Sequence, residues 1–232
     1  MSNIKKTKIM IQIKNLTKIY EVNKNNITTA LNNINLEIKE GELIILKGSS
    51  GSGKSTILST IAGLSRPTSG EVIINNERIS KLPDNFASIF RREYIGFIFQ
   101  KYNLIPNISV KENILIPLIP QNPDVKEVEK LLENVMKKFK IEHKKDDIVK
   151  NLSGGEQQRV AIARSQINNP NIIIADEPTA NLDKDLSLHF IDILRELKQM
   201  GKTIIVATHD PLFFDLNFTD RLIEVSNGEI VL

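Results

Sequence analysis

The sequence predicts an α/β protein whose core is a parallel β-sheet. Three short apolar runs, residues 42–47, 172–175 and 203–207, have the length and composition of strands that are buried on both faces. A segment with helical periodicity, residues 186–200, separates the last two runs. Short apolar runs that alternate with helices are typical of βαβ units, in which the strands lie parallel.

The remaining elements follow from shorter patterns. Apolar and polar residues alternate, as they do in half-buried strands, over residues 9–14, 34–38 and 71–75. One more strand is expected over residues 95–99. An Asn-rich turn is expected at residues 23–26, and Asn227-Gly228 is expected to close a hairpin over residues 221–232. A helix is expected to begin at about Lys54, directly after a glycine-rich turn.

The middle of the chain has a helical pattern from about residue 107 to 167, apart from a break between Pro117 and Pro123. The length of 232 residues fits a single large domain. We therefore expect one α/β core formed by residues 1–100 and 161–232, with a helical lobe inserted at about residues 101–160.

Composition and charge argue against several classes of function. The 31 basic and 28 acidic side chains leave a net charge of +3 without a basic stripe, so nucleic acid is not an expected partner. The chain has no cysteine, and its histidines, His143, His189 and His209, are widely spaced, which argues against a metal cage made of protein side chains. There is neither a signal peptide nor an apolar run of roughly 18 residues, so a cytoplasmic location is expected.

A phosphate-binding loop is expected between the first apolar run and the helix that follows it. Residues 48–55, Gly-Ser-Ser-Gly-Ser-Gly-Lys-Ser, match the pattern G-x-x-x-x-G-K-[ST]. Glycines allow the backbone to curl around an anion, with the N–H groups of the loop and of the helix N-terminus directed inward. Lys54 is expected to reach the β- and γ-phosphates, and the Ser55 hydroxyl to bind Mg²⁺. The expected nucleotide-binding residues are Gly48, Ser49, Ser50, Gly51, Ser52, Gly53, Lys54, Ser55 and Thr56.

Two carboxylates follow the apolar run of residues 172–175. Because ligands bind at the carboxyl ends of parallel strands, Asp176 is expected to reach the Mg²⁺ shell. Glu177 is expected to orient and deprotonate the attacking water. An acidic pair after a strand is a weak signal alone, since acidic residues often begin turns, but a phosphate loop in the same chain makes it strong.

An octet in the second half of the chain carries the most specific signal. Residues 152–159, Leu-Ser-Gly-Gly-Glu-Gln-Gln-Arg, resemble the signature motif of ABC-type ATPases. The resemblance extends over about residues 11–228. It implies a P-loop NTPase core of ABC ATPase type, with an antiparallel β subdomain and a helical insertion lobe, and an enzyme that hydrolyses ATP with Mg²⁺.

The resemblance also implies roles for residues outside these motifs. Gln100 resembles the glutamine of the Q-loop, which senses Mg²⁺ and the attacking water, and His209 resembles the switch histidine. Residues 180–183 resemble the D-loop. Tyr20 lies where the family has an aromatic ring that stacks on adenine, although alone it also fits a strand aromatic. The implied catalytic residues are Glu177, His209 and Gln100, and the implied Mg²⁺ ligands are Ser55, Gln100 and Asp176.

In this family two nucleotide-binding domains pack head to tail, and each ATP lies between the phosphate loop of one domain and the signature motif of the other. The resemblance therefore implies a homodimer or pseudo-dimer of ATPase subunits that closes on ATP. A ligand drives such closure only because it binds the closed state better. The residues implied to act in trans are Ser153, Gly154, Gly155, Gln157 and Asp183.

Finer similarity points to the LolD/MacB-type branch of lipoprotein-releasing and macrolide-export systems, with the FtsE cell-division ATPase as a relative. The segments that carry it are residues 63–70, 91–100, 102–106, 110–113 and 177–183. Ala180 stands where glycine is frequent, and Ser165-Gln166 replaces a small apolar pair. Neither departure touches the expected chemistry.

The branch implies an ATPase that drives a separate integral membrane permease, exports lipoprotein, peptide or macrolide-type cargo, and lies on the inner face of the cell membrane. The permease contact is expected in a groove between core and lobe, near residues 100–110. Two alternatives stay open. One is an FtsE-like regulatory ATPase of a cell-envelope complex without cargo, and the other is a soluble ABC ATPase that acts on DNA or ribosomes.

Overall fold

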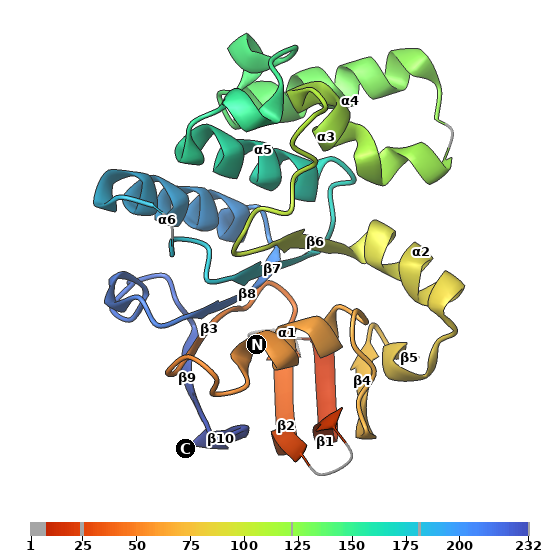
Figure 1. Cartoon of the computed structure of the whole chain (residues 1–232), viewed down its shortest axis with the longest axis vertical. Coiled ribbons are helices and arrows are strands. Elements are labelled where there is room, and N and C mark those ends of the chain that lie inside the picture. Colours follow the sequence, from red (N-terminus) through yellow and green to blue (C-terminus); the bar gives the residue numbers. More distant parts are fainter. Residues whose placement is uncertain (1–7, 24–25, 122, 181, 232) are drawn as a thin grey trace, which may run out of the picture.

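Two β-sheets and a helical lobe make up the part of the chain that the structure describes (Figure 1). The structure is a computed structural model and describes residues 8–23, 26–121, 123–180 and 182–231. The larger sheet has the strand order β10-β9-β3-β8-β7-β6, and the smaller has the order β2-β1-β4-β5. The lobe, with α3, α4 and most of α5, lies at the opposite end of the molecule from the smaller sheet (Figure 1).

Parallel pairing dominates the larger sheet. Its strands are β3 (Leu43–Lys47), β6 (Ile95–Ile98), β7 (Ile172–Asp176), β8 (Thr203–Thr208), β9 (Arg221–Ser226) and β10 (Glu229–Val231). The pairs β9–β3, β3–β8, β8–β7 and β7–β6 are parallel, and β10 returns antiparallel to β9. The predictions of a parallel sheet and of the C-terminal hairpin are confirmed.

Alternate residues of the central strands enter two different hydrophobic cores. Leu43 and Ile45 of β3 pack into the core shared with the lobe and α6 (Lys184–Gln199), whereas Ile44 and Leu46 pack into the core shared with the smaller sheet and α1 (Lys54–Ile61). Because successive strand side chains point to opposite faces, a strand buried on both faces has to be apolar throughout.

The smaller sheet is antiparallel. Its strands are β1 (Ile9–Asn23), β2 (Asn26–Lys39), β4 (Ser69–Ile74) and β5 (Glu77–Arg78). The first two are far longer than the alternating runs 9–14 and 34–38, because register shifts interrupt the alternation of residues. The chain reverses between Asn23 and Asn26, which pair with each other, whereas residues 24 and 25 of the predicted turn lie outside the described residues.

The lobe is less helical than the sequence indicates. It contains α3 (Val110–Leu115), the 3₁₀ segment η2 (Ile116–Gln121), α4 (Val125–Lys138) and the first turns of α5 (Gly154–Gln166). The expected helix is wrong between α4 and α5, where only the short 3₁₀ turns η3 (Glu142–Lys144) and η4 (Val149–Asn151) form. The carbonyl oxygens of this segment instead accept hydrogen bonds from α3: the N–H of Val110 donates to Asp147 O, and the N–H of Lys111 donates to Lys145 O, both at 3.0 Å.

Three further elements complete the described chain: α2 (Asp84–Tyr94) and the 3₁₀ turns η1 (Ile79–Lys81) and η5 (Pro211–Phe213). The sequence analysis missed α2, of which only Ala87 and Phe90 are buried. No helix in the described ranges is long and apolar enough to cross a membrane.

Helix α5 runs from the lobe into the core, across the expected boundary at residues 160–161. Its C-terminal end packs on β6, where a Cβ atom added to Gly96 would lie 2.3 Å from the carbonyl oxygen of Ser165. Because that neighbour is backbone, it does not rotate away, so only glycine permits this approach.

We expect Gly96→Ala to force β6 and α5 apart and to lower the free energy of unfolding by about 1–3 kcal/mol, the usual cost of overpacking. Chemical denaturation of the variant and the wild type measures the difference. An unchanged midpoint would show that the two elements are free to separate.

Candidate functional site

A cleft of about 430 Å³ opens at the carboxyl ends of the parallel strands. It brings together Gln100 after β6, Glu177 after β7, His209 after β8 and residues 50–56 of the predicted phosphate loop. The full lining is Thr28, Thr29, Ala30, Ser50, Gly51, Ser52, Gly53, Lys54, Ser55, Thr56, Gln100, Glu177, His209, Asn227 and Gly228. We call this the nucleotide cleft.

The beginning of α1 is suited to an anion. No side chain in the described part of the chain caps it, and its first turn carries no acidic residue, so its free N–H groups face the loop. In contrast, α3 and α5 each begin with a Ser–Glu capping box. The Lys54 ammonium is buried beside the loop, where it donates to the carbonyl oxygens of Gly48 at 2.7 Å and Ser49 at 2.9 Å. Positive charge and unpaired N–H groups at one place fit a phosphate chain.

Glu177 is held in an uncommon conformation. Its φ of 42° lies in the left-handed region, which a non-glycine residue adopts only when its surroundings enforce it. One carboxylate oxygen lies 3.5 Å from Lys54 Nζ, and the other lies 2.9 Å from Nδ1 of His209 and accepts a 3.3 Å hydrogen bond from the backbone N–H of His209. The carboxylate is therefore fixed between a buried cation and an exposed imidazole at the open side of the cleft.

Asp176 lies beside the phosphate loop. The hydroxyl of Ser55 donates to Oδ1 of Asp176 at 2.9 Å, which joins the two predicted Mg²⁺ ligands from α1 and β7. Burial raises the pKa of the Asp176 carboxyl, against the opposing effect of the Ser55 hydrogen bond. No cluster of three or more His, Cys, Asp or Glu side chains occurs in the described residues. A carboxylate and a hydroxyl nevertheless fit Mg²⁺, which takes few protein oxygens and fills its shell with water and substrate phosphates.

Two parts of the cleft were missed by the sequence analysis. Residues 28–30 come from β2, and Asn227-Gly228 is the turn between β9 and β10. Gly228 donates its N–H to the carbonyl of Ser52 at 2.9 Å, and a Cβ atom on Gly53 would lie 2.8 Å from the carbonyl oxygen of Ala30. The hairpin and β2 therefore brace the loop from outside, and no local motif signals contacts so distant in sequence.

Three predicted nucleotide contacts lie beside this cleft rather than on its wall. Tyr20, which is 39% exposed on β1, stands opposite Thr28 and has the Lys18 ammonium 4.8 Å from its ring centroid. Gly48 and Ser49 line a neighbouring hollow together with His209.

A second cleft of about 570 Å³ collects the signature residues. Its lining is Ser153, Gly154, Gly155, Glu156, Arg159, Asp183 and Leu186. Ser153 and Glu156 form the capping box of α5, in which Glu156 Oε2 accepts a hydrogen bond from the backbone N–H of Ser153 at 2.8 Å. This stabilises the first turn of the helix. We call the second cleft the signature cleft, and it shares no lining residue with the nucleotide cleft.

Two residues of the predicted signature and D-loop segments are not among those that line the signature cleft. Gln157 does not line the signature cleft, because its amide donates to the carbonyl of Leu152 at 3.0 Å. Asn181 of the D-loop segment lies outside the described residues. Arg159, which the sequence analysis did not single out, lines the cleft, and its Nε is buried without a hydrogen-bond partner in the described part of the chain.

Comparison with known proteins agrees with this geometry. The profile of the family described as "ABC transporter" matches residues 31–180. The chain belongs to the ABC transporter family. This ABC ATPase is 43% identical to the uncharacterized ABC transporter ATP-binding protein MJ1508 of Methanocaldococcus jannaschii, over 96% of this chain and 98% of that protein.

Two relatives with more specific names are similar over the same part of the chain. The lipoprotein-releasing system ATP-binding protein LolD of Wigglesworthia glossinidia brevipalpis is 41% identical, over 96% of each protein. The macrolide export ATP-binding/permease protein MacB of Vibrio parahaemolyticus is 38% identical, but this chain spans only 34% of its length.

The fold agrees with a solved structure at the same level of identity. The dimeric post-hydrolysis structure of the ATP-binding cassette MJ0796 bound to ADP and Pi has a TM-score of 0.88 and 41% identity, covering 96% of this chain and 97% of that one. The predictions of an ABC ATPase fold and of an ATP-binding ATPase subunit of ABC transporter type are confirmed.

Asp176→Asn tests the electrostatics of the metal side of the cleft. Because burial raises the pKa of this carboxyl, its ionised form lowers the free energy of unfolding at neutral pH. This loss of stability disappears as the pH falls below both the raised pKa of the folded chain and the ordinary pKa of the unfolded chain. In the absence of nucleotide and Mg²⁺, we expect the variant to melt about 2–4 °C higher than the wild type at pH 7.5. The difference should shrink toward about pH 4. Thermal melts in EDTA over this pH range measure it, and a lower melting temperature at pH 7.5 would contradict the prediction.

Proposed function

We propose that this ABC ATPase forms a head-to-tail homodimer, or a pseudo-dimer with a similar subunit, that closes on two ATP molecules and drives a separate membrane permease. The observation that carries the proposal is the separation of the nucleotide cleft from the signature cleft on one chain. Each bound ATP then needs a second chain to meet a signature motif. The dimeric state of the MJ0796 relative supports this arrangement.

Within one nucleotide cleft we assign different residues to phosphate binding, water activation, metal binding and adenine stacking. Lys54 and the N–H groups of residues 48–56 bind the phosphates, as their buried charge and uncapped helix favour. Glu177 accepts the proton of the attacking water, and His209 holds the other side of its carboxylate. Ser55, Asp176 and Gln100 would hold Mg²⁺, which would supply positive charge beside the phosphate oxygens. Tyr20 stacks on adenine through its exposed ring face.

The second chain supplies the cap over the γ-phosphate. Ser153, Gly154 and Gly155 lie at the N-terminus of α5, where the helix dipole favours an anion although the Glu156 carboxylate of the capping box opposes it. Arg159, whose positive charge offsets Glu156, and Asp183 line the same cleft. Gln157, which lies in the same helix α5, belongs to the residues that act on the ATP of the second chain. ATP thereby holds the two chains together, and loss of its γ-phosphate removes the bridge.

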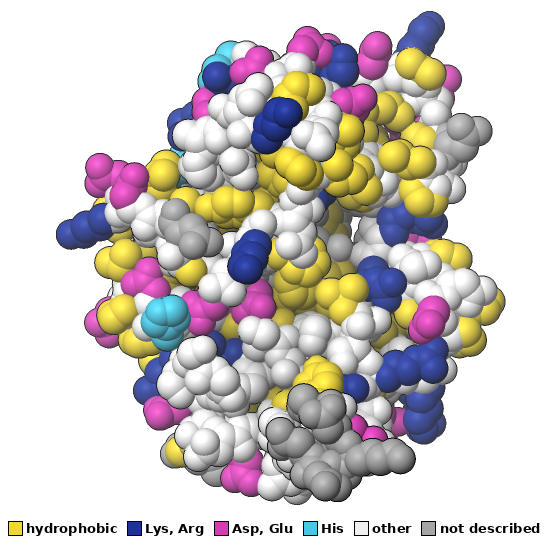
Figure 2. Space-filling view, in the orientation of Figure 1, with side chains coloured by type: hydrophobic (Ala, Val, Ile, Leu, Met, Phe, Trp, Pro, Cys, Tyr) yellow, Lys and Arg dark blue, Asp and Glu magenta, His cyan; other side chains and the backbone are white. Residues whose placement is uncertain are grey.

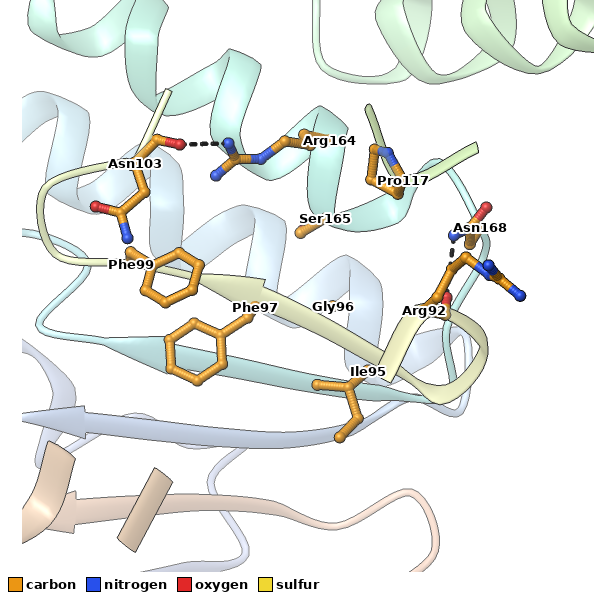
Figure 3. Close-up of a pocket in the computed structure, with 10 residues that line it drawn as sticks. All are labelled: Arg92, Ile95, Gly96, Phe97, Phe99, Asn103, Pro117, Arg164, Ser165 and Asn168. Atoms are coloured by element: carbon orange, nitrogen blue, oxygen red, sulfur yellow. Dashed lines mark hydrogen bonds between the residues drawn. The ribbon is translucent and has the colours of Figure 1, made fainter. Parts of the chain in front are cut away.

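A hollow of about 150 Å³ between core and lobe supports a permease contact (Figure 3). The rings of Phe97 and Phe99 lie side by side along one wall, with centroids 4.2 Å apart, and Pro117 stands on the lobe side. Hydrophobic side chains also gather across the middle of this face, between the lobe and the smaller sheet (Figure 2). The charged residues of the lining are Arg92 and Arg164, and no carboxylate of the described chain lines it.

This hollow, which we call the groove, therefore fits an apolar segment of a membrane protein that carries a carboxylate. We propose that this partner belongs to the exporter type, as the names of the LolD and MacB relatives suggest, with lipoprotein, peptide or macrolide-type cargo. The ATPase would then lie on the inner face of the cell membrane, held there by the permease.

Glu177→Gln tests the catalytic assignment. The amide keeps the size of the side chain but does not accept a proton, so we expect turnover to fall by at least about 100-fold, the contribution of a general base. The variant should retain ATP and accumulate as a dimer. Phosphate release and light scattering with ATP measure the two effects.

The control combines Glu177→Gln with Ser153→Arg, which places a bulky cation in the signature cleft. This double variant should bind ATP as a monomer without forming the dimer. Wild-type turnover in the single variant would remove Glu177 from the mechanism, and loss of monomer binding in the double variant would mean that Ser153 acts within its own chain.

Arg92→Glu tests the groove. The Arg92 Nε is buried without a hydrogen-bond partner in the described residues, so the substitution removes no hydrogen bond of this atom. The melting temperature and basal hydrolysis of the variant are measured as controls for its fold. We expect the tagged wild-type chain to recover an integral membrane protein from detergent-solubilised membranes, and the variant to recover much less of it. Mass spectrometry identifies the partner. Equal recovery by both proteins would place the contact elsewhere, and a partner that is a nucleic acid or ribosome would overturn the transporter role.

A further inference from the structure

One buried side chain connects α5, the helix that begins at the signature cleft, to the segment that carries Glu177. Gln158 lies in the middle of α5 and is only 4% exposed. Its Nε2 donates a 2.6 Å hydrogen bond to the carbonyl oxygen of Pro178, the residue that follows Glu177. This contact therefore links the helix that begins at the signature cleft to the residue that follows Glu177 of the nucleotide cleft.

The contact acts on backbone that is already constrained. Glu177 adopts a φ of 42°, and the next residue is a buried proline, which lacks an N–H group and offers only its carbonyl for hydrogen bonding. The surrounding backbone is held from the β8 side: Ala207 O accepts from Glu177 N at 2.8 Å, and Asp210 Oδ2 accepts from the Thr179 hydroxyl at 2.9 Å. Gln158 holds the same turn from the opposite element, α5.

The start of α5 has little freedom to move alone. A Cβ atom on Gly155 would lie 2.8 Å from Cδ1 of Leu186, so the helix rests directly on α6. Three residues further along the helix, Gln158 is the point at which any displacement of α5 reaches Pro178. A closely packed interior transmits displacement, so a shift of α5 at Gln158 would be passed to Pro178, the residue next to Glu177.

We propose that Gln158 is a positioning residue that couples the two ATP sites of the dimer. When the signature cleft of one chain engages the ATP of the second chain, α5 shifts, and Gln158 carries that shift to Glu177 in the first chain's own site. This inference rests on the proposed dimeric mechanism, and it adds the route by which one site senses the other.

Helix α5 provides a matched control for the test. Gln166 is 7% exposed on the same helix, and among the described residues its Nε2 donates a single long hydrogen bond, of 3.4 Å, to the hydroxyl of the adjacent Ser165. Methionine has a similar length to glutamine and lacks its donor and acceptor. Comparison of Gln158→Met with Gln166→Met therefore separates the loss of the Pro178 contact from the loss of a buried amide on α5.

We expect Gln158→Met to lower kcat by about tenfold, the scale of a slightly misplaced catalytic group, with KM for ATP changed by less than about twofold. The Hill coefficient of hydrolysis in ATP should fall toward one. Gln166→Met should keep wild-type kinetics. In the Glu177→Gln background, Gln158→Met should still form the ATP-bound dimer, which shows that folding, binding and closure survive.

A wild-type kcat and Hill coefficient for Gln158→Met would overturn the proposal, as would equal losses in the two methionine variants. Gln158→Glu keeps the side-chain shape but sets a carboxylate against the Pro178 carbonyl, so it gives a second measurement if the methionine variant folds poorly. It should be slower than Gln158→Met, and wild-type kinetics for it would also overturn the proposal. Failure of the dimer mechanism is distinguishable, since it appears as turnover or absence of dimer in Glu177→Gln alone.

Discussion

The common carboxyl edge of β3, β7 and β8 is the constraint on which the functional site depends. Parallel pairing sets Lys47 opposite Thr208, and Asp176 opposite Ala207. The phosphate loop and His209 directly follow β3 and β8, and the acidic pair lies at the end of β7, so the register of the sheet brings them to one place. A one-residue slip would turn every buried side chain of a strand to the other face, and both cores oppose such a slip.

Burial of the central strands on both faces also explains why the site is enclosed on one side and open on the other. The central strands are buried on both faces, by the lobe and α6 on one and by α1 and the smaller sheet on the other. The residues after the strands are less buried, and strained conformations such as that of Glu177 occur there. Strain of this kind persists only where the surroundings over-determine the backbone, which the bonds to Ala207 and Gln158 do here.

Helix α5 unites features that a division into core and lobe would separate. Its first turn forms the signature cleft, its middle holds Pro178, and its last turns pack on β6. Near that end Arg164 donates to the carbonyls of Tyr102 and Asn103, each at 2.6 Å, and so fixes the loop after Gln100 beside the groove. One helix therefore contacts the signature cleft, the segment that carries Glu177 and the wall of the hollow between core and lobe.

Local patterns in the sequence were enough to predict the elements and residues whose signal lies within one short segment. The apolar runs of β3, β7 and β8 predicted the sheet because burial on both faces leaves no polar position, and the phosphate loop, the acidic pair and the signature octet are continuous motifs. Tertiary structure decided the rest. Register shifts hide the length of β1 and β2, and backbone pairing with α3 replaces helix after α4. Helix α2 was missed although its residues have an amphipathic helical pattern. Residues 28–30 and the Asn227-Gly228 turn reach the nucleotide cleft only because distant strands pack around the loop, and contacts between segments so far apart leave no pattern in the local sequence.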